Sequence, residues 1–468
     1  MPTLPHPATY APEQAILSLG EAFYDPVDAA DFPQTILRFR NDRWASAVGL
    51  EGLSDEAWLR HFGRFEPVPD NLPRPLALRY HGHQFRSYNP DIGDGRGFLF
   101  AQLRDGAGRL LDLGTKGSGQ TPYSRFGDGR LTLKGGVREI LATEMLEALG
   151  VETSKTFSLI ETGEALERND EPSPTRAAVL VRLQHSHIRL GTFQRLAYFE
   201  QAEEMRTLAA YCLRHYYGEE PGDDPAARLL ACFVPKAAEL AASYIAAGFV
   251  HGVLNTDNIA ITAQSFDYGP WRWAPLWDGG FTAAYFDHAG LYAFGRQPEA
   301  IHWNCVQFAR ALTAIAEAEA LTPSLETFPA EFQRALVRAI FWRLGIRPSE
   351  QERDSALLVA LETALAKKTV EIDRFFFDWR GGRRRAQGSA DPAYADDAFK
   401  GLSQLLEAYE SGPGDLDHAY WSDEAPCSMH IDEVEAIWSR IDEADDWSRL
   451  HAKVAAVRRM GEALRSGA

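Results

Sequence analysis

Cysteine is scarce in this chain of 468 residues, and the few cysteines follow no pattern. The four lie far apart and form no C-x-x-C pair: Cys212, Cys232, Cys305 and Cys427. This spacing argues against a structural zinc site and against a disulfide scaffold, and it fits a reducing compartment.

Long apolar runs are missing as well. The longest, Leu240 to Val250, is far shorter than the roughly 18–20 residues that a membrane helix needs. The first residues, Met1 to Pro7, have neither the basic region nor the apolar region of a secretory signal. We therefore expect a soluble, cytoplasmic protein without a membrane partner.

Basic residues are outnumbered by acidic ones, 48 against 66, which gives a formal net charge of −18. Such an acidic chain is not expected to bind nucleic acid. A P-loop of the form G-x-x-x-x-G-K-[ST] is also missing, and no glycine pattern opens a dinucleotide-binding helix. What is present is 45% hydrophobic and 11% aromatic residues, which suffices for a large core.

The chain divides by composition into four regions. Residues 1–75 mix short helical patterns with prolines and are predicted to form an N-terminal extension packed on a core. Residues 76–195 are rich in strand patterns and glycine loops, whereas residues 196–380 are mainly helical. Residues 381–468 are predicted to be a linker and a C-terminal helical extension. The basic cluster Arg380–Arg385 is interpreted as solvated linker, with contact to RNA or phosphate as the alternative.

Within the helical region, helices are predicted from Gln201 to His215 and from Pro235 to Phe249. They are predicted to resume at Ile301 and to continue to about residue 378. The tryptophans that follow residue 270 are expected to pack in the core of this region.

A polar stretch follows the apolar end of the second predicted helix: His251-Gly252-Val253-Leu254-Asn255-Thr256-Asp257-Asn258. Kinase-like phosphotransferases place an Asn seven residues after a His in this way, and an Asp before an aromatic-Gly pair; both bind Mg²⁺. Asn258 lies seven residues after His251, and Asp267 precedes Tyr268-Gly269. Asn258 and Asp267 are therefore candidate ligands for Mg²⁺ or Mn²⁺ bound through a triphosphate.

The position that carries the catalytic Asp in kinases is occupied by Val253, which cannot accept a proton. Asp257, next to the candidate metal ligand Asn258, is the obvious substitute base. The alternative is that residues 255–258 form an ordinary polar turn, since Asn, Asp and Thr favour turns.

The strand-rich region carries glycine loops and a lysine at a strand end. A hairpin turn, Asp105-Gly106-Ala107-Gly108, leads into a strand that ends at Lys116. One glycine loop precedes this hairpin in the sequence and contains Gly93, Gly95 and Arg96. A second loop follows it and contains Asp128 and Gly129. A lysine and glycine-rich turns hold phosphates in the small lobe of kinases.

Further charged residues could complete a phosphate site. The helix predicted from Val137 to Gly150 offers Glu139 and Glu144 as partners of the lysine, unless both are solvated helix charges. Arg182 and Arg189 follow a predicted strand and could hold a triphosphate through forked hydrogen bonds, although a lone arginine is usually a surface charge.

Taken together, these segments resemble the selenoprotein O (YdiU-like) family of pseudokinases, over about residues 76–310. The match runs through Tyr80–Phe85, Gly93–Arg96, Lys116–Arg125, Asp128–Arg130, Arg138–Glu139, Ser186–Arg189, His251–Asn258, Asp267–Pro270, Gln297–Pro298 and Trp303–Asn304. The K-G-x-G-x-T-P-Y-S-R and H-G-V-L-N-T-D-N blocks in this order are specific to that family.

The resemblance implies an α+β, two-lobed protein-kinase-like fold, with a small β-rich N-lobe and a large helical C-lobe between the two extensions. It implies a protein adenylyltransferase that binds ATP in reverse relative to kinases and transfers AMP to hydroxyl side chains of proteins. Carried over by residue, Lys116, Arg182 and Arg189 would hold the triphosphate, and Glu139 would orient Lys116. The nucleotide would be lined by Gly93, Gly95, Arg96, Asp128 and Gly129, with Asp267 and Asn258 on the metal and Asp257 as the base.

The chain departs from the family in three places, and the first is that the helical N-P-x-x-x-L-R-N-type block expected after residue 350 is not recognisable. Residues 86–92 separate the first block from the glycine loop, and Cys427 is not at the C-terminus, where some members carry a redox residue. Two alternatives to AMP transfer stay open: transfer of UMP, and a nucleotide-binding scaffold without catalysis. We expect a monomer whose partners are ATP and proteins that carry Ser, Thr or Tyr hydroxyls.

Overall fold

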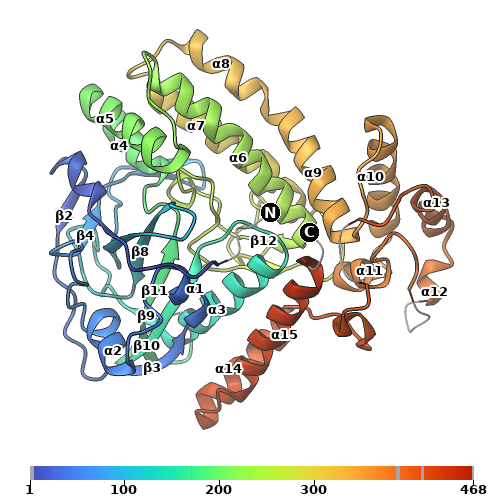
Figure 1. Ribbon diagram of the computed structural model, residues 1–468, viewed down its shortest axis with the longest axis horizontal. Helices are drawn as coiled ribbons and strands as arrows, with labels where there is room; N and C mark the ends of the chain where they lie inside the picture. Colours follow the sequence, from blue (N-terminus) through green and yellow to red (C-terminus); the bar gives the residue numbers. More distant parts are fainter. Residues whose placement is uncertain (1–4, 170, 386–390, 413–415, 466–468) are drawn as a thin grey trace.

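The sheet that dominates the N-terminal half contains nine antiparallel strands among the residues described by this computed structural model, which are 5–169, 171–385, 391–412 and 416–465 (Figure 1). Its strand order is β2-β4-β7-β8-β11-β10-β3, with β1 paired to β7 and β9 to β11. The strands are β1 Pro12–Glu13, β2 Tyr24–Pro26, β3 Ile36–Arg40, β4 Leu76–Leu78, β7 Leu99–Arg104, β8 Leu110–Lys116, β9 Leu131–Thr132, β10 Lys155–Leu166 and β11 Thr175–Gln184.

The central strands are buried on both faces, which explains their nearly continuous apolar sequence. Every residue of β8 is buried, and all but one residue of β11 are buried. The predicted hairpin between β7 and β8 is confirmed: Asp105 Oδ1 accepts hydrogen bonds from the backbone N–H groups of Ala107 (3.0 Å) and Arg109 (2.9 Å). Gly108, at φ +77°, provides the left-handed residue that this turn needs.

The N-terminal extension is built into this sheet. It supplies β1, β2 and β3, and its helices α1 (Asp42–Ala47) and α2 (Asp55–Gly63) cover one face. Ser54 Oγ caps α2 by accepting from Ala57 N at 3.2 Å, and serine is a favoured residue at this position. Trp58 stacks on Phe157 of β10 with ring centroids 4.9 Å apart, so the extension shares the core of the sheet. The boundaries between the four regions stay predictions.

The other face of the sheet is covered by α3 (Leu133–Ala148). Thr132 Oγ1 caps this helix by accepting from Gly135 N at 3.1 Å. The helix starts four residues earlier than predicted and is almost wholly buried, because the C-terminal helix α15 (Ser448–Arg465) packs along its outer side (Figure 1).

Helices make up most of the remaining chain and lie beside the sheet (Figure 1). They are α4 Leu190–Tyr198, α5 Ala202–Cys212, the π-helix η2 Leu213–Tyr217, α6 Pro225–Ala247, α7 Gln297–Leu312, α8 Ala318–Glu326, α9 Phe328–Leu344, α10 Gln351–Leu365, α11 Ile372–Asp378, α12 Asp391–Tyr394, α13 Asp397–Leu406 and α14 Ile431–Ala444. Short elements complete the chain: η1 Ala15–Leu19, η3 Thr256–Asn258, η4 Phe294–Arg296, η5 Ala419–Ser422, and the pairs β5 Gly82–Gln84 with β6 Ser87–Asn89 and β12 Phe249–Val250 with β13 Arg272–Trp273. A two-part α+β architecture, with strands first and helices after, is thus confirmed.

Helix α6 is the central helix of the helical part. The prediction that it begins at Pro235 is wrong: it begins at Pro225, after the cap residue Asp224, and Pro235 lies inside it. By length and composition α6 could cross a membrane, but 67% of its most apolar stretch is buried inside the protein. Packing against α7, α8 and α9 explains its apolar sequence as that of a core helix.

The interpretation of the cluster Arg380–Arg385 as solvated linker is wrong for its first residues. Arg380 is 1% exposed, and Gly381 and Gly382 are buried. The Arg380 guanidinium donates to Arg343 O at 3.1 Å and to Leu464 O at 3.0 Å. It therefore satisfies carbonyl groups at the C-terminal ends of α9 and α15 and ties the two helices together.

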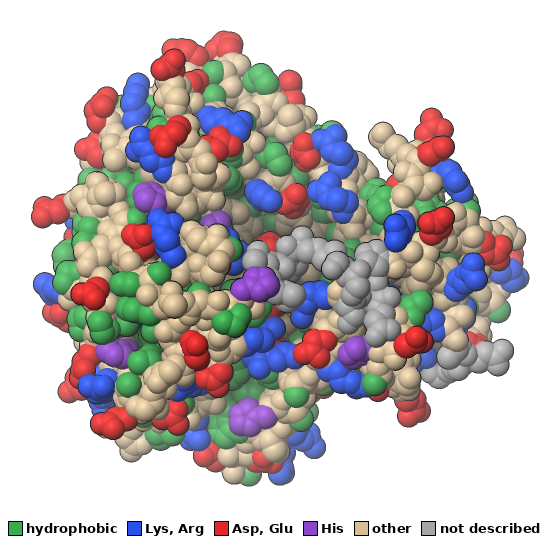
Figure 2. All heavy atoms as spheres, viewed as in Figure 1, with side chains coloured by type: hydrophobic (Ala, Val, Ile, Leu, Met, Phe, Trp, Pro, Cys, Tyr) green, Lys and Arg blue, Asp and Glu red, His purple; other side chains and the backbone are tan. Residues whose placement is uncertain are grey.

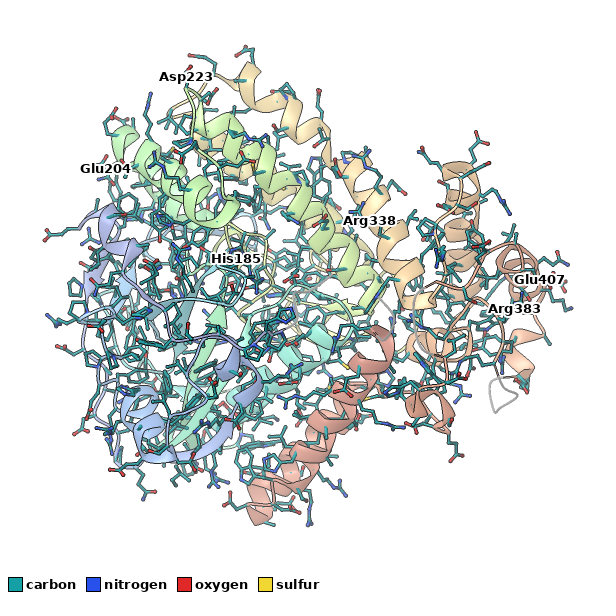
Figure 3. All side chains as sticks on the ribbon, viewed as in Figure 1. His185, Glu204, Asp223, Arg338, Arg383 and Glu407 are labelled. Carbon is teal, nitrogen blue, oxygen red and sulfur yellow. The ribbon has the colours of Figure 1, made fainter. Side chains whose placement is uncertain are left out.

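On the face drawn in Figure 2, acidic and basic side chains are interspersed. Exposed charged residues such as Arg383 and Glu407 lie at the end formed by α10–α13, away from the sheet (Figure 3).

Candidate functional site

A cavity of about 790 Å³ opens between the sheet and the segment that follows α6. Ten of the residues predicted from the sequence line it: Gly93, Gly95, Arg96, Lys116, Asp128, Gly129, Arg182, Arg189, Asp257 and Asp267. Of the predicted residues, all of which the structure describes, Glu139 and Asn258 do not line it. The wall is strongly polar, so the cavity suits a charged ligand.

Lys116 is the last residue of β8 and lies at the centre of the cavity wall. Its Nζ is 2.6 Å from Glu139 Oε1 on α3 and 2.8 Å from Asp267 Oδ1. Lys116 and Glu139 are 4% and 1% exposed, so the pair is fixed by its surroundings. The other candidate, Glu144, pairs with Arg458 of α15 at 2.6 Å. The structure therefore places Glu139, behind the cavity, as the partner of Lys116.

Asp267 is surrounded by cations. Arg182 Nη1 lies 3.4 Å from its Oδ1, and Arg189 Nη1 lies 3.8 Å from its Oδ2. Burial alone would raise the pKa of Asp267, but Lys116 and the two arginines hold it well below the usual range. Both guanidinium groups also lie over the ring of Phe266, 5.1 Å and 4.9 Å from its centroid. Arg182 and Arg189 are thus buried parts of the site and not surface charges.

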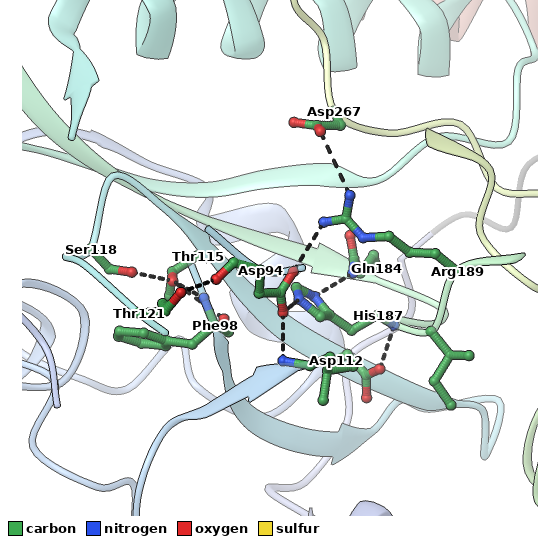
Figure 4. Close-up of polar contacts among 12 residues, drawn as sticks. Asp94, Phe98, Asp112, Thr115, Ser118, Thr121, Gln184, His187, Arg189 and Asp267 are labelled. Carbon is green, nitrogen blue, oxygen red and sulfur yellow. Dashed lines mark hydrogen bonds and ion pairs between the residues drawn. The ribbon is translucent and has the colours of Figure 1, made fainter. Parts of the chain in front are cut away.

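Asp94 connects the glycine loop to this cluster (Figure 4). Its carboxylate accepts from Leu78 N at 3.0 Å, lies 2.8 Å from His187 Nε2 and is 3.3 Å from Arg189 Nη2. The amide nitrogen of Gln184 contacts His187 Nδ1 at 2.8 Å. Because that amide can only donate, His187 Nδ1 accepts and Nε2 carries the proton toward Asp94. Burial raises the pKa of Asp94, but His187 and Arg189 lower it below its ordinary value overall.

Sequence reasoning passed over Asp94, although it stands between Gly93 and Gly95. It also gave no role to Tyr123, against which this loop packs. A Cβ at Gly93 would lie 2.5 Å from Tyr123 Cγ, and one at Gly95 would lie 2.9 Å from Tyr123 O. Ser124 Oγ donates to Gly95 O, which closes the contact. The glycines are needed for this close approach, and the signal in the sequence was the T-P-Y-S order within the K-G-x-G-x-T-P-Y-S-R block.

The polar stretch after β12 is buried and bonded to distant parts of the chain. Asn255, Thr256 and Asp257 are 4%, 0% and 8% exposed. Thr256 Oγ1 accepts from the backbone N–H of His83 at 2.7 Å, and Asn255 Oδ1 accepts from that of Phe85 at 3.0 Å. The stretch does contain a turn, η3, but its side chains bond to the distant residues His83 and Phe85 and not only locally, as in an ordinary polar turn.

Two further bonds set the shape of the loop. His251 Nε2 donates to Phe266 O at 2.9 Å, which holds the residue before Asp267. Asn258 Nδ2 donates to Val253 O at 3.0 Å, so its amide oxygen is turned away from that carbonyl. Ala260, just after Asn258, forms a β-bridge with Arg189, and this bridge brings Arg189 beside Asp257.

The carboxylate of Asp257 is not fully hydrogen-bonded. Its Oδ1 is buried and has no hydrogen-bond partner. The Arg189 guanidinium donates to the backbone carbonyl of Asp257 at 2.9 Å and not to its carboxylate. Burial raises the pKa of Asp257 to about 6, against the opposing charge of Arg189. A carboxylate of this kind can accept a proton near neutral pH.

The donor set of the site fits a hard divalent cation. Asp267 and Asn258 offer a carboxylate and an amide oxygen, which are ligands that Mg²⁺ and Mn²⁺ prefer. Among the described residues no group of three or more His, Cys, Asp or Glu side chains gathers as a metal site. A cation held here would therefore complete its shell with phosphate oxygens and water, as Mg²⁺ does in nucleotide sites.

These features define a class of protein. The Lys–Glu pair between a strand and a helix, and the Asp that meets the lysine, are the phosphate-holding parts of a kinase-like phosphotransferase. The position of the kinase base is occupied by Val253, so the class is a kinase-like nucleotide-binding enzyme that lacks the kinase base.

Comparison with known proteins identifies the family. Residues 8–458 match the family model described as protein adenylyltransferase SelO, and the chain belongs to this family. A protein of Synechocystis named protein nucleotidyltransferase YdiU is 51% identical over 352 residues, 74% of this chain and 72% of that protein. A protein of the same name from Synechococcus elongatus is 41% identical over 477 residues, 97% of this chain and 96% of that protein. The chain is therefore a nucleotidyltransferase.

Among solved structures, the kinase domain of a rhoptry antigen of Toxoplasma gondii is similar at 9% identity with a TM-score of 0.26, covering 61% of this chain and 83% of that one. A TM-score this low carries no argument. The assignment of a kinase-like fold therefore rests on the sheet, the helical part and the Lys116–Glu139–Asp267 contacts.

Proposed function

We propose that this enzyme transfers AMP from ATP to Ser, Thr or Tyr hydroxyls of proteins, with ATP bound in reverse relative to protein kinases. The observation that carries the proposal is the contrast between Val253 and Asp257. The kinase position for the base holds an aliphatic side chain, while Asp257, four residues later, lines the cavity with a buried oxygen that has no partner.

The reaction follows from this placement. The acceptor hydroxyl loses its proton to Asp257 and its oxygen forms a bond to the α-phosphorus, while the bond from that phosphorus to the bridging oxygen breaks. Pyrophosphate is the leaving group. Since the pKa of Asp257 is about 6, the group is ionised at pH 7 and remains basic enough to accept the proton.

The cations of the site stabilise the charge that develops on pyrophosphate. Lys116, Arg182 and Arg189 are held together by Asp267, and all three line the cavity. Because they are buried and preorganised, their effect on a triphosphate is stronger than in water. Mg²⁺ or Mn²⁺, held by Asn258 and Asp267, would supply further neutralisation of phosphate charge.

The test uses ATP labelled at different phosphates. With α-³²P-ATP and Mg²⁺ or Mn²⁺, we expect label on protein acceptors or on the enzyme itself; with γ-³²P-ATP we expect none. Asp257→Ala should abolish the labelling, while Asp397→Ala, which removes an exposed carboxylate on α13, should not change it. Label from γ-³²P-ATP would establish a kinase, and α-³²P-UTP labelling that exceeds ATP labelling would establish UMP transfer. ATP binding without any transfer would favour the scaffold.

A further inference from the structure

Three exposed aromatic rings lie next to the catalytic loop. Phe85, Phe286 and Tyr285 are 38%, 41% and 79% exposed, and we refer to them as the aromatic platform. The ring centroids of Phe85 and Phe286 are 5.7 Å apart, and those of Phe286 and Tyr285 are 5.0 Å apart. Phe85 lies at the tip of the β5–β6 hairpin, and the other two belong to the segment between Asp267 and α7.

The aromatic platform is joined to the loop that carries Asp257. Asn255 Oδ1 accepts from Phe85 N at 3.0 Å and from the Tyr292 hydroxyl at 2.7 Å, and the rings of Phe85 and Tyr292 are 5.1 Å apart. The residue before Phe85, Gln84, lines the nucleotide cavity. Phe85 therefore follows a cavity residue in the sequence and is bonded to Asn255, which stands two residues before the proposed base.

The hairpin tip is held in a strained conformation. Phe85 and Arg86 are the two turn residues between the paired Gln84 and Ser87, and their φ angles are +49° and +64°. A turn of this kind favours Asn-Gly, because large side chains are strained at positive φ. Such strain persists where the surroundings fix it, and it concentrates at functional sites. Here it keeps a phenyl ring exposed beside the active site.

The chemistry of the exposed surface is aromatic rather than charged. The guanidinium of Arg86 is engaged: it pairs with Glu299 of α7 at 2.9 Å and lies 5.5 Å from the ring centroid of Trp303. Arg296 pairs with the same Glu299 at 3.2 Å. What the tip offers to a partner is therefore ring surface, which favours an apolar or aromatic side chain.

We propose that the aromatic platform binds the polypeptide segment that carries the acceptor hydroxyl, through an apolar or aromatic side chain close to that hydroxyl in the sequence. This rests on the proposed function, because the acceptor must bring its hydroxyl to Asp257. An extended chain advances about 3.3 Å per residue, so side chains placed one to three residues from the hydroxyl sample separations of up to about 10 Å.

The test measures peptide binding and AMP transfer separately. The probes are fluorescein-labelled 13-residue peptides with a central Thr or Tyr in a Gly-Ser background. A Phe is placed at each position within three residues of the centre, and matched peptides carry Glu there. Binding is followed by fluorescence anisotropy with ATP analogue present, and transfer is followed with α-³²P-ATP. We expect at least one Phe peptide to bind about fivefold or more tightly than its Glu counterpart, the scale of one interface anchor.

Variants locate the binding to the platform. F85N/R86G installs the favoured turn residues and F286S removes a second ring; each should reduce binding of the Phe peptide to that of the Glu peptide. The double variant should also unfold at a higher urea concentration, which shows that the loss is not a folding defect. L405S on α13 alters an apolar residue of similar exposure, 39%, and should change nothing. ATP affinity should be unchanged in all variants.

The outcomes separate this inference from the proposed function. If Phe and Glu peptides bind the natural enzyme equally, or if both platform variants bind the Phe peptide normally, the inference is overturned whatever the enzyme does with ATP. If Phe peptides bind at the platform but receive no label from α-³²P-ATP, the inference of a peptide-binding surface is supported and the proposal of AMP transfer is contradicted.

Discussion

Replacing Asp257 by Asn should make the protein more stable and inactive at the same time. The native fold buries this carboxylate without a partner for Oδ1, and burial raises its pKa from 3.8 to about 6. The folded state therefore favours the protonated form. Asn has nearly the same shape and no charge, so it removes the cost of burying the ion while keeping the packing.

The magnitude follows from the pKa shift. About two pKa units at about 1.4 kcal/mol each amount to about 3 kcal/mol. Below about pH 4 the Asp257 carboxyl is protonated in both the folded and the unfolded state, so the natural protein and the variant should differ by less than about 1 kcal/mol. As pH rises from about 4 to 6 the unfolded chain ionises first, and the natural protein loses stability relative to the variant. Above pH 6 the full difference is present.

Urea unfolding of both proteins at pH values from 4 to 8 measures this difference. The free energy of unfolding of Asp257→Asn minus that of the natural protein should rise through the window and level off above pH 6. Asp397→Asn is the control: its carboxyl is exposed and its pKa is lowered by hydrogen bonding to Lys400, so no such rise is expected. A difference that is flat with pH, or that falls, would refute the raised pKa and with it the assignment of the base.

The remaining predictions can be tested with the same enzyme preparations. The AMP-transfer rate of the natural protein should rise with pH through a midpoint near pH 6 and level off above about pH 7, and a profile governed by a pKa near 4 would speak against Asp257. Glu139→Gln should lower kcat/KM about tenfold to a hundredfold, because it removes the carboxylate 2.6 Å from Lys116 Nζ, whereas Glu144→Gln on the same helix should leave kcat/KM unchanged. Equal losses in the two variants would mean that the helix and not the ion pair matters. Arg380→Met should reduce the free energy of unfolding by about 2–4 kcal/mol, since it leaves buried carbonyl groups at two helix ends unsatisfied; ATP affinity should not change, and a neutral effect on urea unfolding would contradict this role.

Local patterns predicted those features that depend on residues close in sequence. The cap at Ser54, the Asp105 turn and the amphipathic helix that carries Glu139 follow from short-range hydrogen bonding and periodicity. The seven-residue spacing from His251 to Asn258 likewise gave the predicted register of the kinase-like loop, which stays a prediction. These features needed no knowledge of the tertiary contacts.

Other features depend on contacts between distant segments, and the sequence could not reveal them. Glu139 and Glu144 look alike on the helix, and only the approach of Arg458 from the far end of the chain separates them. The hydrogen bond between Asp94 and His187 joins residues that are 93 positions apart in the sequence. The basic cluster at Arg380 is typical of a solvated linker by composition, but α9 and α15 meet around it.

The orientation of ATP tests the central claim most directly. A crystal structure with a non-hydrolysable ATP analogue and Mg²⁺ would show which phosphate lies beside Asp257. We predict the α-phosphate there, with the outer phosphates against Lys116, Arg182 and Arg189. A γ-phosphate beside Asp257, with the adenine placed as in a protein kinase, would contradict the account.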